Sequence, residues 1–157
     1  MADNIEIRID NKAVEEALLK VASKCEDMKP LMKNIAGIMA DAVEENFEQE
    51  GRPDKWQELA ESTIKHRKKT KHWPGKILQV EGQLATSITT QYDNESAVIG
   101  SNLAYAAIHQ LGGQAGKGKK VTIPARPYLN LNDADIKYIS NVAYKFMFSC
   151  NINPNFS

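Results

Sequence analysis

The sequence predicts a single α+β domain in which a largely antiparallel sheet packs against helices. Two long amphipathic patterns lie near the start of the chain and a third lies near its end, with short β-type segments between them. The strand–helix alternation typical of a parallel sheet is missing. The chain has 157 residues, an ordinary length for one domain, and its 20 basic and 20 acidic side chains cancel. We therefore expect residues 1–157 to form two long N-terminal helices, a short middle helix and a C-terminal helix packed against the sheet.

The first 50 residues read as one strand followed by two helices. Ile5, Ile7 and Ile9 alternate with polar residues, which predicts a half-buried strand, and Asp10 or Asn11 can cap the next helix. Apolar residues then recur every three or four positions along two stretches that meet around Lys29 and Pro30. The stripe expected to face the core is Val14, Leu18, Val21, Cys25 and Met28 in the first helix, and Met32, Ile35, Ala36, Met39, Ala42, Val43 and Phe47 in the second.

Shorter elements follow. Ser62 or Thr63 is placed to cap a short helix, and residues 87–91 and 97–101 read as paired strands with a turn at 93–95. Residues 104–111 predict a helical turn that glycines 112 and 113 end. A strand begins at Val121 and is interrupted by Pro124.

Asn132 or Asp133 is expected to cap the last helix, because short polar side chains favour that position. Its periodicity directs one set of side chains inward: Ile136, Ile139, Ala143 and Phe146 or Met147.

Three segments are expected to be flexible. Residues 65–76 hold six Lys or Arg and no acid, so the run repels itself and buries little. Residues 113–120 form a basic loop rich in glycine, and the polar tail at 149–157 is expected to fray.

The basic run within 65–76 has three interpretations: a solvated loop, a loop that docks on protein, or a nucleic-acid contact in which Trp73 stacks on bases. Its cations are Lys65, Arg67, Lys68, Lys69 and Lys71.

The charge is also uneven along the chain. Residues 1–60 hold 8 basic and 14 acidic side chains, and residues 61–157 hold 12 and 6. The difference suits identical subunits that meet acidic face to basic face, unless folding interleaves the two halves.

No enzymatic signature is present, so we expect no catalysis, no cofactor and no metal. The sequence lacks a nucleophile elbow, a phosphate loop and a zincin motif. His66 and His72 lie in a lysine run that would repel a dication, and His109 is expected to be a satisfied structural histidine. Cys25 and Cys150 are expected to be packed, reduced thiols of a cytosolic protein.

Membrane insertion and secretion are not expected. No apolar stretch approaches the roughly 18–20 residues of a membrane span. The first ten residues alternate in polarity and contain acids, unlike a signal peptide.

Four blocks make the sequence more specific: FEQEGRPDKWQELAEST, KILQVEGQLATSI, VIGSNLAYAAIHQLGG and IPARPYLNLNDAD. In this order, from about Phe47 to Ile139, they resemble the phage virion morphogenesis family, which includes tail completion proteins of contractile-tailed phages. Lys55 departs from the small residue that relatives tend to have before the tryptophan, and the basic segment at 65–76 is not specific to the family.

The resemblance implies a structural role, late in tail assembly, at the end of the tail that meets the head. It implies no catalysis, tail and neck proteins as partners, and self-assembly into a ring, often sixfold. The implied location is the host cytoplasm during assembly and then the tail or neck of the virion. A nucleic-acid-binding accessory protein that uses the 65–76 segment is the alternative.

The blocks also supply candidate interaction or structural residues. A guanidinium at Arg126, held between two prolines, suits either an internal clamp on a helix end or a pair across a subunit interface. Tyr105 and His109 can share one helical face. The full set of candidates is Trp56, Leu59, Leu84, Tyr105, His109, Arg126 and Pro127.

Overall fold

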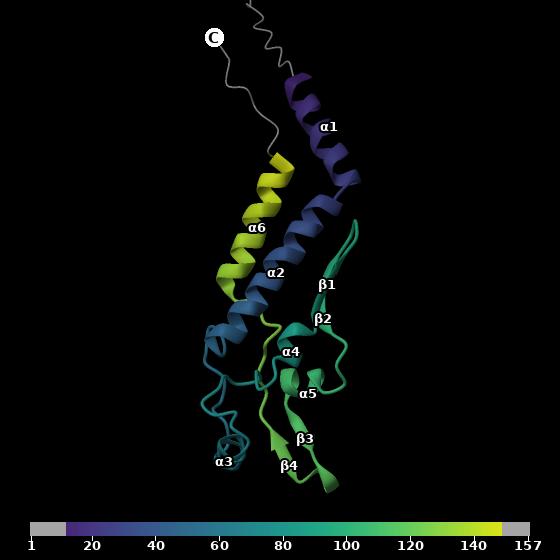
Figure 1. The fold of residues 1–157 in the computed structure, drawn as a ribbon. Helices are drawn as coiled ribbons and strands as arrows, with labels where there is room; N and C mark the ends of the chain where they lie inside the picture. The colour runs from purple at the N-terminus through teal and green to yellow at the C-terminus, as the bar shows by residue number, and fades with distance from the viewer. Residues whose placement is uncertain (1–11, 149–157) are drawn as a thin grey trace, which may run out of the picture.

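Helix α2 is the central layer of an elongated molecule. The computed structural model describes residues 12–148. Helix α6 (Asp133–Phe148) packs on one side of α2 (Lys29–Gln49), and a β-hairpin packs on the other (Figure 1). Helix α1 (Lys12–Glu26) continues from the upper end of α2 and contacts α6. The lower end holds the short helices and a second hairpin, so the candidate residues from residue 56 to 127 gather there (Figure 1).

The hairpin beside α2 is formed as the alternating pattern predicts. Strands β1 (Ile88–Tyr92) and β2 (Ala97–Ser101) are antiparallel, with a register that runs from Ile88 opposite Ser101 to Tyr92 opposite Ala97. Asp93 holds the turn, since its carboxylate accepts hydrogen bonds at 2.7 Å from the backbone N–H groups of Glu95 and Ser96. These backbone hydrogen bonds lower the pKa of Asp93.

Asn94, at the tip of this hairpin, caps the junction between α1 and α2. Its Oδ1 accepts hydrogen bonds from the N–H groups of Met28 (2.6 Å) and Lys29 (3.1 Å), and its Nδ2 donates to the Glu26 carbonyl (3.0 Å). The start of α2 has no capping side chain of its own. A residue more than 60 positions along the chain therefore satisfies backbone groups at the ends of both helices.

A second hairpin and a set of short helices form the lower end. Strands β3 (Gly113–Ala115) and β4 (Val121–Ile123) are antiparallel and are joined by the 3₁₀ turn η1 (Lys117–Lys119). Helix α5 (Ala106–Leu111) ends at Gly112, where φ is 73° and ψ is 175°. A Cβ at this position would lie 2.8 Å from the backbone nitrogen of Ala125, so only glycine fits without movement. Helices α3 (Glu61–Lys69) and α4 (Gln83–Thr86) complete this end.

The core lies where α2 meets the lower end. Phe47 contacts Trp56 edge to face at 5.8 Å between ring centroids, and it contacts Tyr128 at 5.4 Å. The hydroxyl of Tyr128 donates to the Ala106 carbonyl (2.9 Å), and burial raises the pKa of that phenol. The cluster of buried apolar residues is Val43, Phe47, Trp56, Ile77, Leu84, Ala106 and Tyr128.

A buried polar network ties α2 to the chain that enters α6. The side chain of Asn46 is fully buried and donates to the carbonyls of Tyr128 (2.9 Å) and Asn130 (2.8 Å). Its Oδ1 accepts from Nε of Arg52 (2.9 Å), whose guanidinium also pairs with Asp135 at 3.0 Å. Each polar atom of Asn46 therefore has a partner, as burial requires.

The α+β class is confirmed, with one difference in the sheet. The described residues contain two separate two-stranded antiparallel sheets, β1–β2 and β3–β4, rather than one larger sheet. The long helices, the short middle helix, the first hairpin and the C-terminal helix lie close to where the pattern predicts them. Asn132 caps α6, because its Oδ1 accepts from the Asp135 N–H (2.9 Å) while Asp135 accepts from the Asn132 N–H (3.0 Å). The strand expected at residues 5–9 and the tail from 149 onward lie outside the described residues, as does Cys150.

Several expectations of burial and of loop structure are wrong. The α1 stripe is only partly packed: Leu18 is 64% exposed and Cys25 is exposed rather than buried, while Val21 and Met28 are half-buried. Ile136 on α6 is also half exposed. Helix α3 begins after Ala60, without the side-chain cap expected from Ser62 or Thr63. Residues 65–69 belong to α3, and residues 113–120 contain β3 and η1, so neither segment is loop throughout.

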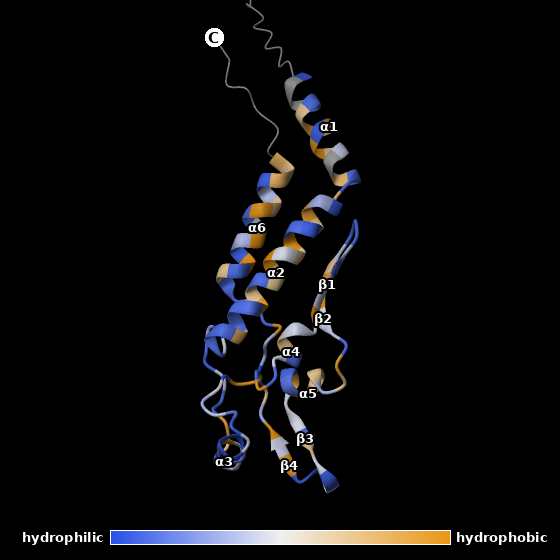
Figure 2. Cartoon of the chain, viewed as in Figure 1, coloured by the Kyte–Doolittle hydropathy of each residue, from blue (hydrophilic) through white to orange (hydrophobic). Residues whose placement is uncertain are grey.

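Hydrophobic residues recur along α2 and α6, whereas α3 and the tip of the second hairpin are strongly hydrophilic (Figure 2). Among residues 12–148, no helix is both long enough and apolar enough to cross a membrane.

Candidate functional site

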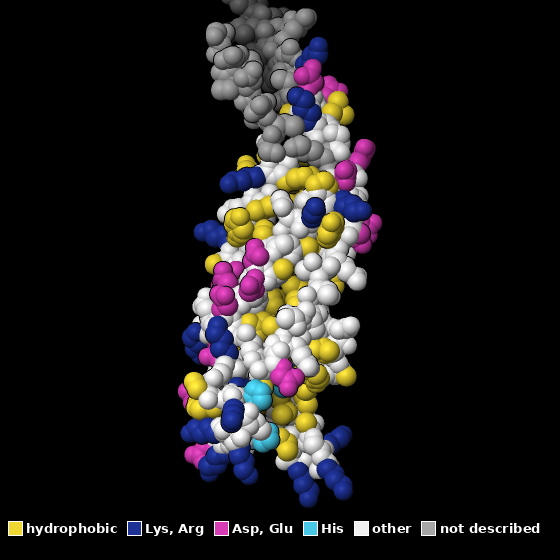
Figure 3. Space-filling view, in the orientation of Figure 1, with side chains coloured by type: hydrophobic (Ala, Val, Ile, Leu, Met, Phe, Trp, Pro, Cys, Tyr) yellow, Lys and Arg dark blue, Asp and Glu magenta, His cyan; other side chains and the backbone are white. Residues whose placement is uncertain are grey.

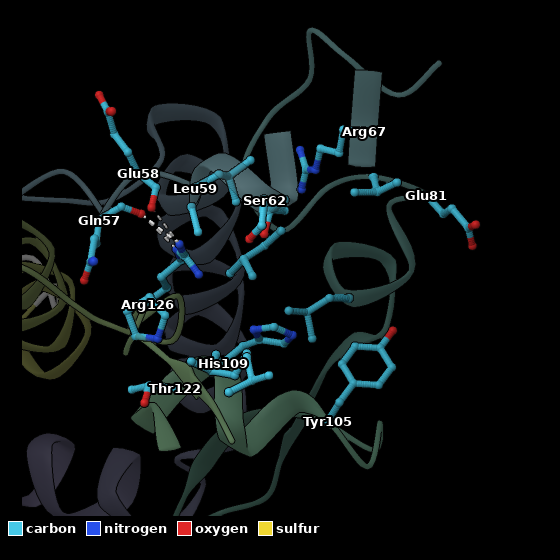
Figure 4. A pocket seen from close by; sticks show the side chains of 18 of the residues that line it. Gln57, Glu58, Leu59, Ser62, Arg67, Glu81, Tyr105, His109, Thr122 and Arg126 are labelled. Carbon is cyan, nitrogen blue, oxygen red and sulfur yellow. Dashed lines mark hydrogen bonds between the residues drawn. The ribbon is translucent and has the colours of Figure 1, made fainter. Parts of the chain in front are cut away.

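A pocket of about 720 Å³ lies at the lower end, between α3, α4, α5 and β4. Leu59, Leu84 and Ile123 contribute to its apolar lining. Three nitrogen-bearing side chains, Arg67, His109 and Arg126, converge on it from α3, α5 and the segment after β4 (Figure 4). Five of the candidate residues line this pocket: Leu59, Leu84, Tyr105, His109 and Arg126.

Arg126 is an internal clamp on the segment that precedes α3. Its guanidinium is buried at 5% exposure, and it donates through Nε (3.1 Å) and Nη2 (2.9 Å) to the Gln57 carbonyl. Nη2 also donates to the Glu58 carbonyl at 3.2 Å. The backbone N–H of Arg126 donates to the His109 carbonyl (2.8 Å), which joins the clamp to α5. The guanidinium thus holds loop carbonyls and not a helix end, and its role in an interface stays a prediction.

Arg67 brings a second buried cation to the same pocket. It is 6% exposed, and its Nη1 donates to the carbonyls of Lys76 (3.0 Å) and Gly75 (3.4 Å). Burial and the positive charge of Arg67 both lower the pKa of Arg126. Within residues 12–148, neither guanidinium forms an ion pair with a carboxylate.

His109 lies on the floor of the pocket with its ring edge against Tyr105, at 5.9 Å between centroids and 83° between planes. Its Nδ1 is buried and has no hydrogen-bond partner among the described residues. Burial, and then the charge of Arg126, lower the pKa of His109, which favours the neutral imidazole. His109 thus differs from the satisfied structural histidine that was expected, since no described residue pairs with its Nδ1, and such an atom is rare in a native core.

The acidic residues at the pocket do not neutralise its cations. Glu58 and Glu81 both contribute to the lining, but their carboxylates point away from Arg126 and Arg67 (Figure 4). Both residues are exposed. The inner part of the pocket is therefore cationic, and its mouth carries acidic side chains.

The remaining candidate residues divide between the core and the surface. Trp56 and Leu84 belong to the core, and Leu59 packs against it, as expected of apolar anchors. Tyr105 is 40% exposed at the pocket, and Pro127 is exposed and does not line it.

The cations of the basic run divide in the same way. Lys65, Lys68, Lys69 and Lys71 are exposed, while Arg67 turns inward. The sequence contains the signal for Arg67: in a helix it shares a face with the half-buried Ile64, three positions before it. The lysines that surround Arg67 obscure this periodicity in the sequence.

No group of three or more His, Cys, Asp or Glu side chains in the described ranges is arranged to hold a metal ion. The pocket offers fixed cationic donors and one neutral imidazole, a set that suits binding of an anionic group.

Comparison with known proteins places this sequence in a family. Residues 9–147 match the phage virion morphogenesis family. The chain is 45% identical over 132 residues to the Mu-like prophage FluMu G protein 2 of Haemophilus influenzae, covering 83% of this chain and 87% of that protein. It is 32% identical over 136 residues to the putative capsid assembly protein G of Escherichia phage Mu, covering 84% and 86%. The Mu-like prophage FluMu G protein 1 of Haemophilus influenzae is 32% identical over 145 residues, covering 88% and 93%. No solved structure matches the chain.

Proposed function

The chain belongs to the phage virion morphogenesis family, and on this premise we propose that it completes the tail and joins it to the head without catalysing a reaction. Its role is structural, and its partners are other phage structural proteins. The relative from phage Mu is named as a putative capsid assembly protein, which supports a place where head and tail meet.

The observation that carries the proposal is the large apolar surface that the long helices leave exposed. Helix α6 buries none of its residues completely. Tyr144 and Phe148 stack on each other at 4.7 Å and are 63% and 53% exposed. Leu18 and Leu19 on α1 are each 64% exposed. Exposed apolar side chains gathered in this way are typical of a surface that binds protein.

The charge distribution supports contact between copies of the chain. Acidic side chains gather over the middle of the molecule, where α2 and α6 run together, whereas Lys and Arg gather at the lower end (Figure 3). The exposed acids of α2 are Asp41, Glu44, Glu45 and Glu48. A basic end placed against the acidic middle of the next copy makes a heterologous contact, and such contacts close into rings. We propose a ring of this kind in the tail or neck, assembled in the host cytoplasm.

Electron microscopy tests the role directly. Phage produced without the protein should show separate heads and incomplete tails, and the wild-type gene supplied in trans should restore joined particles. A double variant, Tyr144→Ser with Phe148→Ser, should fail to restore them, while a double variant of exposed polar residues on the same helix, Lys137→Ala with Asn141→Ala, should succeed. Normal infectious particles in the absence of the protein would overturn the proposal.

A further inference from the structure

We propose that the pocket between α3, α4, α5 and β4 binds the carboxylate of an Asp or Glu side chain in a segment of a partner protein. An apolar neighbour of that acid would pack on the pocket wall. The identity of the occupant as an assembly partner rests on the function proposed above, whereas the carboxylate site itself can be tested on the isolated protein.

The charge of the pocket is the first argument. Arg67 and Arg126 are 6% and 5% exposed and have no carboxylate partner among the described residues. Two buried like charges at one pocket are unfavourable unless an opposite charge compensates them. The partly buried guanidinium of Arg52 is compensated in this way, because it pairs with both Glu45 (2.7 Å) and Asp135 (3.0 Å). The pocket lacks that acid, and a ligand carboxylate would supply it.

The unused donors are the second argument. Arg126 bonds through Nε and Nη2, and its Nη1 has no partner among residues 12–148. Within the same range, Arg67 donates hydrogen bonds only through Nη1, so its Nε and Nη2 are still available to donate to a ligand. A guanidinium binds a carboxylate through two parallel N–H groups. As the Nδ1–H tautomer, His109 would donate one more hydrogen bond from the buried atom that has no partner.

The shape of the pocket selects a protein side chain over nucleic acid. Both guanidiniums are recessed, so they are reached by a narrow group that enters the pocket and not by the phosphates on the surface of a duplex. The exposed carboxylates of Glu58 and Glu81 point away from the two guanidiniums, and a chain of phosphates would meet their repulsion more strongly than a single carboxylate would (Figure 4). The apolar lining from Leu59, Leu84 and Ile123 gives the neighbouring side chain of a peptide a surface to bury.

A pair of short peptides tests the binding. The probes are acetyl-Leu-Glu-Leu amide and acetyl-Leu-Gln-Leu amide, titrated to millimolar concentration while the NMR signals of the His109 ring are followed. We expect the Glu peptide to bind at least about tenfold more tightly than the Gln peptide, a difference of about 1.4 kcal/mol. Equal affinities, or no shift with either peptide, would overturn the proposal. Stronger binding of inorganic phosphate or of a short DNA duplex to the same site would overturn it in favour of a phosphate ligand.

Variants locate the binding. Arg67→Gln should abolish the preference for the Glu peptide, and Lys68→Gln, which changes the exposed neighbour, should keep it. Should Arg67→Gln fail to fold, Ser62→Glu provides the same test, because Ser62 points into the pocket from α3 (Figure 4). Ser62→Glu should melt at a higher temperature than Ser62→Gln and should no longer bind the peptide. Glu61→Gln, on the exposed side of α3, measures how much an acid stabilises this helix end without the pocket. A stability gain for Ser62→Glu no larger than that control would contradict the proposal.

Each of the two proposals can be refuted without refuting the other. If microscopy confirms the joining role but the peptide and Ser62 experiments fail, the pocket is not a carboxylate site and the assembly role stands. If both peptide and Ser62 experiments succeed but phage without the protein is normal, the pocket binds acids and the assembly role is wrong. Phage that carries Arg67→Gln should yield fewer joined particles than phage that carries Lys68→Gln.

Discussion

The body of the molecule, residues 43–131, and its two outer helices, α1 and α6, use apolar residues in opposite ways. The body encloses them: Phe47, Trp56 and Tyr128 pack ring against ring. The outer helices display them: neither α6 nor the described side chains of α1 include a buried residue, and Leu19 and Tyr144 are more than 60% exposed. The stability of the isolated chain should therefore come from the body, while the outer helices contribute the surface for assembly.

The largest expected effect is at Trp56, because it is buried in the core of the body. Trp56→Ala should lower the free energy of unfolding by about 3–5 kcal/mol, since it removes a large ring from a packed site. Trp73→Ala is the matched control. Trp73 is 38% exposed, so its replacement should change stability by less than about 1 kcal/mol. Urea unfolding followed by circular dichroism measures both, and equal losses would remove the contrast between core and surface.

Asn46 tests the polar part of the body. Asn46→Leu should destabilise the chain by about 2–4 kcal/mol, because two carbonyls and the Nε of Arg52 lose their buried partner. Asn34→Leu makes the same chemical change at an exposed position of the same helix and should be nearly neutral. Thermal melts at two salt concentrations provide the measurement. A neutral result at Asn46 would mean that water replaces its hydrogen bonds.

Two glycines should respond with opposite signs. Gly112→Ala should cost about 1–3 kcal/mol, because the backbone there is in a region open only to glycine and the new Cβ would meet Ala125. Gly37→Ala, in the middle of α2, meets nothing within 4 Å and should stabilise the chain by about 0.5–1 kcal/mol. Equilibrium unfolding in guanidinium measures both, and a loss at Gly37 would show that this face of α2 is packed in solution.

The smallest effect on stability is expected on α1. Leu18→Glu and Leu19→Glu should each change the free energy of unfolding by no more than about 0.5 kcal/mol, because both side chains are already in water. Joining of heads to tails should nevertheless fail in phage that carries both changes. A large loss of stability would instead show that α1 is covered in the isolated protein, which would weaken the contrast with the body.

Local patterns predicted most elements of the fold and the buried face of α2, but they wrongly predicted a buried face on α1. Periodicity located α2 and α6, and turn residues located the β1–β2 hairpin, because these signals lie within a few positions of each other. Burial depends on neighbours far along the chain. The stripe of α1 has the spacing of a core helix, yet no sheet lies under it among the described residues, so Leu18 and Cys25 remain exposed. The formation of two separate sheets likewise depends on which strands pair with each other. The spacing of residues along the sequence does not determine that pairing.

The candidate site was also only partly predictable, because some of its signals are local in the sequence and others depend on distant neighbours. The prolines on either side of Arg126 predicted a guanidinium held in a fixed position. In the structure this guanidinium binds carbonyls within the chain. Arg67 was counted with its exposed lysine neighbours, because charge alone does not tell an inward side chain from an outward one. The Asn46 network was not predicted, since its partners, Tyr128 and Asn130, are more than 80 positions away.

The side-chain amide of Asn94 couples the β1–β2 hairpin mechanically to the junction between α1 and α2. Because it bonds to backbone groups on both sides of the α1–α2 bend, the hairpin acts as a strut that sets the angle of α1. A neighbouring molecule that pulls on α1 would load the hairpin, and through it α2, instead of simply bending the joint. The chain can in this way transmit force along its length while its core stays intact.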